Sequence, residues 1–237
     1  VISFNYGYNY LLSGKGYFRP YNMEGWGIQN YITIFSKGSP FLQCLLNTMI
    51  IVFVSVPISI ALSLLIAVAL NSIKPLQKLL QTIFFLPYVT NTIAIGMVFS
   101  VMFESQQGLM NTILNMLGHG SINWLGGNVE AGLLFNNQFI TSLVVLICYI
   151  VWNSLPFKVI ILLSALQSVD RQYYQAAQID GTSKFRTFSK ITVPLLSPQI
   201  FYLLITSFIG AFKEYTSVVA IFGENASSVG SHNNMAT

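Results

Sequence analysis

Three charged residues lie within long apolar stretches of this chain, and they are the side chains best placed to act on a solute. Lys158 lies in residues 139–166, and Lys213 and Glu214 lie in residues 200–222. A charge within an apolar helix is costly to bury and usually faces a polar interior or an opposite charge. We therefore expect Lys158 and Glu214 to face one interior and to pair. The alternative is that the last apolar stretch ends early, which leaves Lys213 and Glu214 at the water interface.

Groups suited to enzymatic or metal chemistry are sparse. His119 and His232 lie in Gly-, Ser- and Asn-rich stretches without a Cys or a carboxylate at ligand spacing, which predicts no metal site. Cys44 and Cys148 lie in apolar runs and follow the pattern of small buried residues. The sequence shows no nucleophile–base pair and no phosphate-binding loop, so we expect no enzyme activity in this chain.

The composition is that of an integral membrane protein. Of the 237 residues, 54% are hydrophobic and 8% are charged, whereas soluble domains carry about 25% charged residues. A helix needs about 20 apolar residues to cross a bilayer. Four segments meet this requirement and are predicted to span: about 41–70, 82–103, 139–166 and 200–222. Residues 109–117 have one apolar helical face and predict a short helix on the outer interface.

The basic residues predict the orientation of these spans. Six of the 11 Lys and Arg residues gather in two connections: Lys74 and Lys78, and Arg171, Lys184, Arg186 and Lys190. Such clusters mark cytoplasmic loops. Residues 104–137 contain no Lys or Arg and are predicted to lie outside, together with residues 1–40. Because spans flank the basic clusters, we expect no nucleic-acid partner.

Residues 173–196, YYQAAQIDGTSKFRTFSKITVPLL, form a polar and basic elbow between the last two spans. Its first part is compatible with a helix, and Gly181 then permits a turn that a side chain would resist. Thr182 or Ser183 can cap the helix that follows. An apolar stripe continues at Phe185, Phe188 and Ile191. Two interpretations fit: an amphipathic connector on the membrane surface, and a docking element for a soluble partner.

This elbow resembles the EAA loop of bacterial ABC importer permeases, in which Glu-Ala-Ala is followed by Asp-Gly-Ala and by a spaced Ile-x-x-Pro. The resemblance, together with the apolar stripe, implies that the residues coupled to an ATPase are Gln175, Ala176, Ala177, Asp180, Gly181, Phe185, Ile191 and Pro194. Gln175 replaces the glutamate of the motif and Thr182 replaces an alanine. The glutamine keeps an acceptor oxygen but loses the charge, so we expect a hydrogen bond to the partner and question a salt bridge.

The stretches GIQNYITIF, FFLPY and WNSLPF, in this order, resemble landmarks of the carbohydrate-type permeases, the family of the maltose and glycerol-phosphate transporters. This resemblance implies an all-α, polytopic ABC importer permease fold with a cytoplasmic coupling-helix elbow, in the bacterial cytoplasmic membrane. It also implies a second homologous permease subunit, two cytoplasmic ATPase subunits, an extracellular solute-binding protein and surrounding membrane lipid. ATP and Mg would bind the ATPase, and this chain would hold no cofactor.

The resemblance also implies a sugar site. It assigns substrate binding to Asn153, Ser154, Phe157, Ser207, Gly210, Ala211 and Glu214. Amide, hydroxyl and carboxylate groups suit sugar hydroxyls, and an aromatic face suits a sugar ring. The small residues of this set have an alternative role in close helix packing. The pocket could also lie in the partner permease, and an ABC permease for an amino acid, peptide, phosphate or polyol phosphate is the alternative function. A channel would leave the elbow unexplained.

Members of this family carry further spans on both sides of these landmarks. We therefore expect residues 1–40 to be an extracellular N-terminal segment that ends a preceding span and loop missing from this chain. Residues 41–237 would be the transmembrane core of a permease and would lack its final span.

Overall fold

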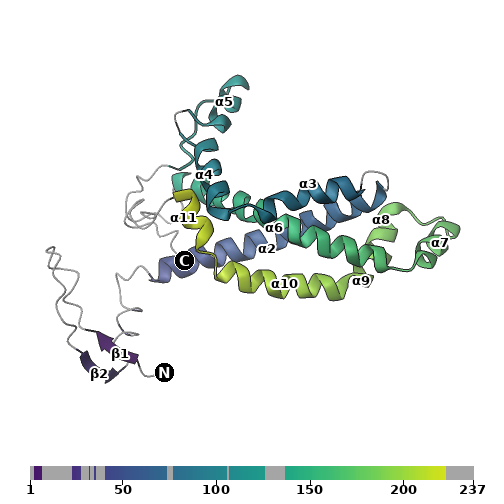
Figure 1. The fold of residues 1–237 in the computed structure, drawn as a ribbon, viewed down its shortest axis with the longest axis horizontal. Coiled ribbons are helices and arrows are strands. Elements are labelled where there is room, and N and C mark those ends of the chain that lie inside the picture. The colour runs from purple at the N-terminus through teal and green to yellow at the C-terminus, as the bar shows by residue number, and fades with distance from the viewer. Residues whose placement is uncertain are drawn as a thin grey trace.

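The computed structural model describes residues 3–6, 23–27, 32, 35, 41–73, 77–105, 107–125 and 137–222. Two long helices, α2 (Phe41–Ser72) and α6 (Asn137–Ser168), pack against each other and form the centre of the bundle (Figure 1). Both are long and apolar enough to cross a membrane. Each contains one proline without ending there, Pro57 in α2 and Pro156 in α6. The predicted all-α, polytopic membrane class is confirmed.

The segment predicted to span at 82–103 is divided into two helices, α3 (Gln77–Val89) and α4 (Thr92–Met102). Asn91 separates them, because its backbone is extended and its side chain accepts a hydrogen bond from the amide of Ile93 at 2.9 Å. Asparagine is among the strongest helix N-caps. The cap starts a new helix inside an apolar segment for which the hydropathy pattern predicts one continuous helix.

The segment predicted to span at 200–222 is also divided. It comprises α10 (Ser197–Phe212) and α11 (Thr216–Phe222), and the connection between them contains Lys213 and Glu214. The apolar run therefore ends early as a helix, as the alternative interpretation of the two charges held. The chain then turns into α11, which packs against α4 and α6.

The elbow precedes α10 and consists of short helices. These are α7 (Arg171–Ile179), α8 (Lys184–Thr187), a π-helical segment η2 (Phe188–Thr192) and α9 (Val193–Leu195). The helical run from α8 to α9 is bent by 67° relative to α10. Pro194 and Pro198 lie on either side of this bend, and proline removes the hydrogen bonds that would keep a helix straight.

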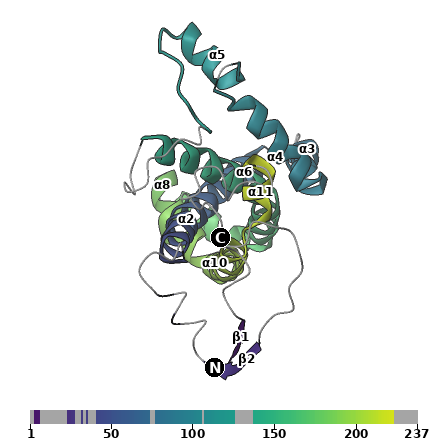
Figure 2. The same cartoon turned by 90° about the vertical axis from the view of Figure 1, so that its left-hand side faces the viewer.

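The opposite end of the long helices carries α5 (Leu109–Met116), the short helix expected there (Figures 1 and 2). Its buried Asn111 is the anchor. The Asn111 side chain donates to the carbonyls of Ser105 and Ile122 and accepts from the amide of Ile122 and the indole of Trp124. In the N-terminal segment, β1 (Ser3–Tyr6) and β2 (Met23–Gly27) form an antiparallel ladder that the sequence analysis did not predict.

Three buried clusters hold the bundle together. One surrounds Tyr149 on α6 and reaches α2, α4 and α11, a second joins α2, α6 and α10 around Leu162, and a third lies between α2 and α10. Tyr149 also donates a hydrogen bond to the carbonyl of Thr92 at 2.7 Å, which fixes the start of α4 against α6. These clusters leave a polar space between α2, α6 and α10.

Candidate functional site

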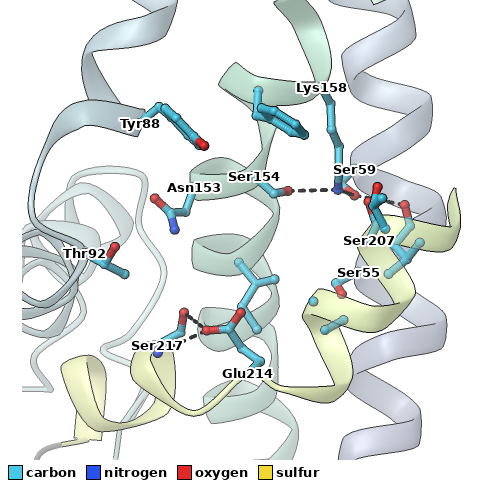
Figure 3. Close-up of a pocket in the computed structure, with 16 residues that line it drawn as sticks. Ser55, Ser59, Tyr88, Thr92, Asn153, Ser154, Lys158, Ser207, Glu214 and Ser217 are labelled. Atoms are coloured by element: carbon cyan, nitrogen blue, oxygen red, sulfur yellow. Dashed lines mark hydrogen bonds between the residues drawn. The ribbon is translucent and has the colours of Figure 1, made fainter. Parts of the chain in front are cut away.

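A pocket of about 300 Å³ lies between these helices and is lined from α2, α3, α4, α6, α10 and α11 (Figure 3). This is a size typical of small-molecule sites, which run from roughly 300 to 1,000 Å³. The seven residues predicted to bind substrate all line it: Asn153, Ser154, Phe157, Ser207, Gly210, Ala211 and Glu214. The structure thus brings two sequence-distant sets together, and their role in binding stays a prediction.

Lys158 lies on α6 and reaches across the pocket wall to α2. Its ammonium donates hydrogen bonds to the hydroxyls of Ser59 and Ser154, the latter at 3.2 Å. Its side chain is only 5% exposed. Each serine hydroxyl donates in turn to a carbonyl of its own helix, Ser59 to Val56 and Ser154 to Val151, both at 2.9 Å. Among the described residues, the ammonium of Lys158 is therefore hydrogen-bonded to two neutral hydroxyls.

Glu214 lies in the connection between α10 and α11. Its carboxylate accepts hydrogen bonds from the amide of Ser217, at 3.2 Å, and from the hydroxyl of the same residue. Lys158 and Glu214 line the same pocket, as predicted, but at separate parts of it (Figure 3). The hydrogen bonds of Lys158 given above go to serine hydroxyls. Direct pairing of the two charges stays a prediction.

An aromatic platform forms another part of the pocket wall. The rings of Tyr88, on α3, and Phe157, on α6, are stacked with their centroids 5.8 Å apart and their planes inclined by 16°. Phe85 packs against Tyr88 from the side, at 5.4 Å. These rings give the pocket an apolar surface, and Figure 3 shows Asn153 near Tyr88.

Several lining residues were not predicted from the sequence: Ser55, Val56, Ser59, Tyr88, Thr92, Ile150, Thr206 and Ser217. Tyr88 ends the FFLPY landmark, in which an aromatic side chain follows a proline near the start of a predicted span. Ser55 and Ser59 lie four residues apart on α2, and this spacing places two hydroxyls on one helical face. Both signals were therefore present in the sequence.

The elbow owes its shape to Gly181. Its φ of +64° lies in the left-handed region, which favours glycine. The amide of Thr182 donates to the carbonyl of Ala177 at 2.9 Å, and that of Gly181 donates to Gln178 at 3.1 Å. This pair of bonds is a Schellman motif that ends α7. Ser183, one of the two predicted caps, accepts from the amide of Arg186 at 3.4 Å and begins α8.

The residues predicted to contact an ATPase are placed mainly on the surface of this elbow. Exposed members are Gln175, Ala176, Asp180, Gly181, Phe185 and Pro194, whereas Ile191 is half-buried and Ala177 is buried. Two large apolar side chains stand out from it, Ile179 at 86% exposed and Phe185 at 79%. The structure leaves their coupling role a prediction.

The protein has two helices long enough to span a membrane, and two further apolar segments that are each divided into two helices near an internal polar pocket. Together with the exposed elbow at one end, this architecture is that of a membrane permease. The chain belongs to the binding-protein-dependent transport system inner membrane component family, whose profile matches residues 59–233. It is accordingly a multi-pass protein of the cytoplasmic membrane, and the family predicted from the elbow and landmarks is confirmed.

Individual relatives agree with this placement. The chain is 31% identical to the trehalose/maltose transport system permease protein MalF of Thermococcus litoralis, over 83% of this chain and 63% of that protein. It is 29% identical to the arabinooligosaccharides transport system permease protein AraP of Bacillus subtilis, over 84% and 60%. The chain thus spans about three fifths of the length of these relatives.

The fold also matches a solved structure. A bacterial alginate ABC transporter in complex with an alginate pentasaccharide-bound periplasmic protein aligns with a TM-score of 0.71 at 22% identity, over 86% of this chain and 67% of that one. The predicted ABC importer permease fold is therefore confirmed.

Proposed function

We propose that this chain is the membrane-spanning subunit of an ATP-driven importer and forms the path for a sugar or oligosaccharide. The observation that carries the proposal is the pocket, in which the stacked rings of Tyr88 and Phe157 lie beside amide, hydroxyl and carboxylate groups. A sugar ring has an apolar face and a polar rim, so it needs both kinds of surface. The named relatives, permeases for trehalose/maltose and for arabinooligosaccharides, support the same solute class.

The elbow would receive the ATPase. Its exposed Ile179 and Phe185 lie among basic residues, including Lys184 and Arg186. Burying them in a groove of a soluble partner removes apolar area from water. The Schellman turn at Gly181 holds the two helical arms in one shape, so motion of the partner would pass to α10 as a rigid-body movement.

The remaining partners follow from the same proposal. A second homologous permease subunit would complete the path, and two cytoplasmic ATPase subunits would bind ATP and Mg. A solute-binding protein would deliver the sugar from outside, as the periplasmic protein in the alginate transporter complex suggests. This chain would carry no ATP chemistry of its own.

The test is purification of the complete permease from its native membrane together with its associated subunits. Uptake of labelled maltooligosaccharides and arabinooligosaccharides is then measured in proteoliposomes with ATP inside and the cognate binding protein outside. We expect an ATPase to co-purify and the sugar panel to be transported. Phe157→Leu should reduce uptake about twofold to tenfold, because ring stacking is worth about 0.5–1.5 kcal/mol beyond area burial, whereas Phe157→Tyr should retain it. Absence of an ATPase from every preparation would refute the proposed function.

A further inference from the structure

Lys158 is a buried charge with incomplete compensation. Its side chain is 5% exposed, and its two acceptors are the neutral hydroxyls of Ser59 and Ser154. Taking an ammonium out of water costs several kcal/mol unless an opposite charge or a full set of hydrogen bonds compensates. An ammonium carries three donors, and these two serines accept two of them.

A second polar group on the same wall has no partner. The hydroxyl of Ser55 is buried, lines the pocket, and lacks a hydrogen-bond partner among the described residues. Ser55 lies four residues before Ser59 on α2 and is 2% exposed. A buried hydroxyl without a partner costs about 1–3 kcal/mol, so this position favours an occupant that accepts a hydrogen bond.

The hydroxyl protons of the two serines that bind Lys158 are already used in other hydrogen bonds and cannot be donated to a solute. Ser59 and Ser154 each give their proton to a carbonyl of their own helix. The ammonium of Lys158 and the hydroxyl of Ser55 therefore remain as buried donors on this part of the wall, with the half-buried Ser207 hydroxyl also lining the pocket. Both kinds of donor suit an oxygen-rich anion, and a charge-assisted hydrogen bond is roughly twice as strong as a neutral one.

The part of the pocket at Glu214 carries a negative charge and accepts hydrogen bonds, in contrast to the part at Lys158. Its carboxylate is an acceptor and would repel an anion, whereas a neutral sugar hydroxyl can donate to it. The pocket thus has a positive part at Lys158 and a negative part at Glu214 (Figure 3). The ring of Phe157 also lines it. A solute that fits both parts carries its charge on one side only.

We propose that Lys158 and Ser55 form an anion subsite, and that the transported saccharide carries a carboxylate, sulfate or phosphate group that occupies it. This inference rests on the proposed function, because it names the substrate class of the same pocket. The ammonium supplies the countercharge, and the two serines Ser59 and Ser154 hold it in position without competing for the anion. Lys158 is thereby a specificity-determining residue for acidic over neutral sugars.

The first experiment tests the solute class with the cognate binding protein. Thermal shifts of that protein are measured with trigalacturonate, with its neutral methyl ester, with maltotriose and its phosphorylated and sulfated derivatives, and with amino acids and peptides. We expect stabilisation by at least one acidic saccharide and none by its neutral counterpart. Stabilisation by neutral sugars alone would overturn the anion subsite and leave the sugar importer intact. Stabilisation only by amino acids or peptides would overturn the proposed function itself.

The second experiment places the effect on Lys158. Uptake of the acidic saccharide and of its neutral counterpart is measured in proteoliposomes of the complete complex, for the native chain and for Lys158→Gln and Lys158→Arg. We expect Lys158→Gln to lower the ratio of acidic to neutral uptake about tenfold, the scale of a lost hydrogen bond to a charged group. Lys158→Arg should restore part of this ratio.

A purely structural role for Lys158 predicts a different result. Loss of the link between α2 and α6 would lower both uptakes equally, together with the melting temperature of the complex, and the ratio would not move. An unchanged ratio, whatever the melting temperature, would overturn the role of Lys158. Ser55→Ala serves as a milder variant that keeps the charge and the link, and the proposal requires it to lower the same ratio by a smaller factor.

Discussion

Two glycines on different helices, Gly210 and Gly96, differ in how much space surrounds them. A Cβ placed on Gly210 of α10 meets nothing within 4 Å, because it points into open space beside the pocket. A Cβ on Gly96 of α4 would lie 2.2 Å from the Cβ of Ala220 on α11. In the proposed function the first glycine would keep space for a solute, whereas the second allows two helices to approach closely.

Gly210→Val should therefore impair transport and leave folding intact. Valine has a helix propensity at least as good as that of glycine, so the melting temperature of the purified complex should not fall. Uptake should drop about tenfold or more, because one methylene in a pocket is already worth about 1–3 kcal/mol. Gly96→Val is the matched control and should lower the melting temperature and the yield. A normal uptake rate for Gly210→Val would show that solute does not pass this wall.

The sequence could place several pocket residues because they belong to short motifs with strong character. The resemblance to carbohydrate-type permeases assigned residues in WNSLPF and in residues 205–215, and all of these residues line one pocket. The serines of α2 could not be assigned in the same way. A serine in an apolar helix can bond to its own backbone, as Ser59 and Ser63 do. Only the three-dimensional neighbours distinguish Ser55, which lacks such a bond.

The elbow is the element whose shape depends most on one residue. Gly181 has a φ of +64°, and nothing lies within 4 Å of a Cβ placed on it. Gly181→Val would be penalised by backbone strain alone, about 1–2 kcal/mol for the left-handed conformation. We expect α7 and α8 to change their mutual angle while the spanning helices stay folded. Solute-stimulated ATP hydrolysis and uptake should both fall severalfold at an unchanged melting temperature.

Gly181→Asn is the control for this element, since asparagine visits the left-handed region readily. It should retain most of the coupling. Equal activity of the valine and asparagine variants would mean that the angle of the elbow does not matter for transport.

α5 is held by a single buried side chain. Asn111 is 1% exposed and bonds to Ser105, Ile122 and Trp124. Asn111→Ala would remove the side chain that joins these groups, at about 1–3 kcal/mol for any of them that stays buried without a partner. The segment should loosen, and a protease added from outside should cleave it several times faster. Asn115→Ala, which removes only an exposed bond to Ser121, should leave the cleavage rate unchanged. Equal rates for the two variants would contradict the anchoring role.

The helix breaks were the elements least accessible from the sequence. Hydropathy averages over a window, so it cannot detect one cap such as Asn91 inside an apolar run. The end of α10 at Phe212 was readable as an alternative, because two charges follow it directly. The packing of α11 against α4 and α6 could not be predicted from the sequence, because it depends on the close approach of Gly96 and Ala220.

At the scale of the whole molecule, the elbow and α5 lie at opposite ends of the two long helices (Figure 1). The basic residues of the elbow and the lack of Lys and Arg in 104–137 then predict one orientation, with the elbow in the cytoplasm. The pocket lies between these ends, lined from helices that lead to both. A change of angle at the elbow can therefore reach the pocket wall through α10, which carries Gly210 and Ala211.

This orientation is testable by single-cysteine labelling. Cys44 and Cys148 are first replaced by alanine, and cysteine is then introduced at the exposed Gly120, beyond α5, or at the exposed Lys184, on the elbow. A membrane-impermeant maleimide added to intact cells should label Gly120→Cys and leave Lys184→Cys unlabelled. Inverted vesicles should give the reverse pattern, because a charged reagent cannot cross the apolar core between the two ends. Labelling of Lys184→Cys from outside would show that the protein has the opposite orientation in the membrane. The elbow could then not contact a cytoplasmic ATPase.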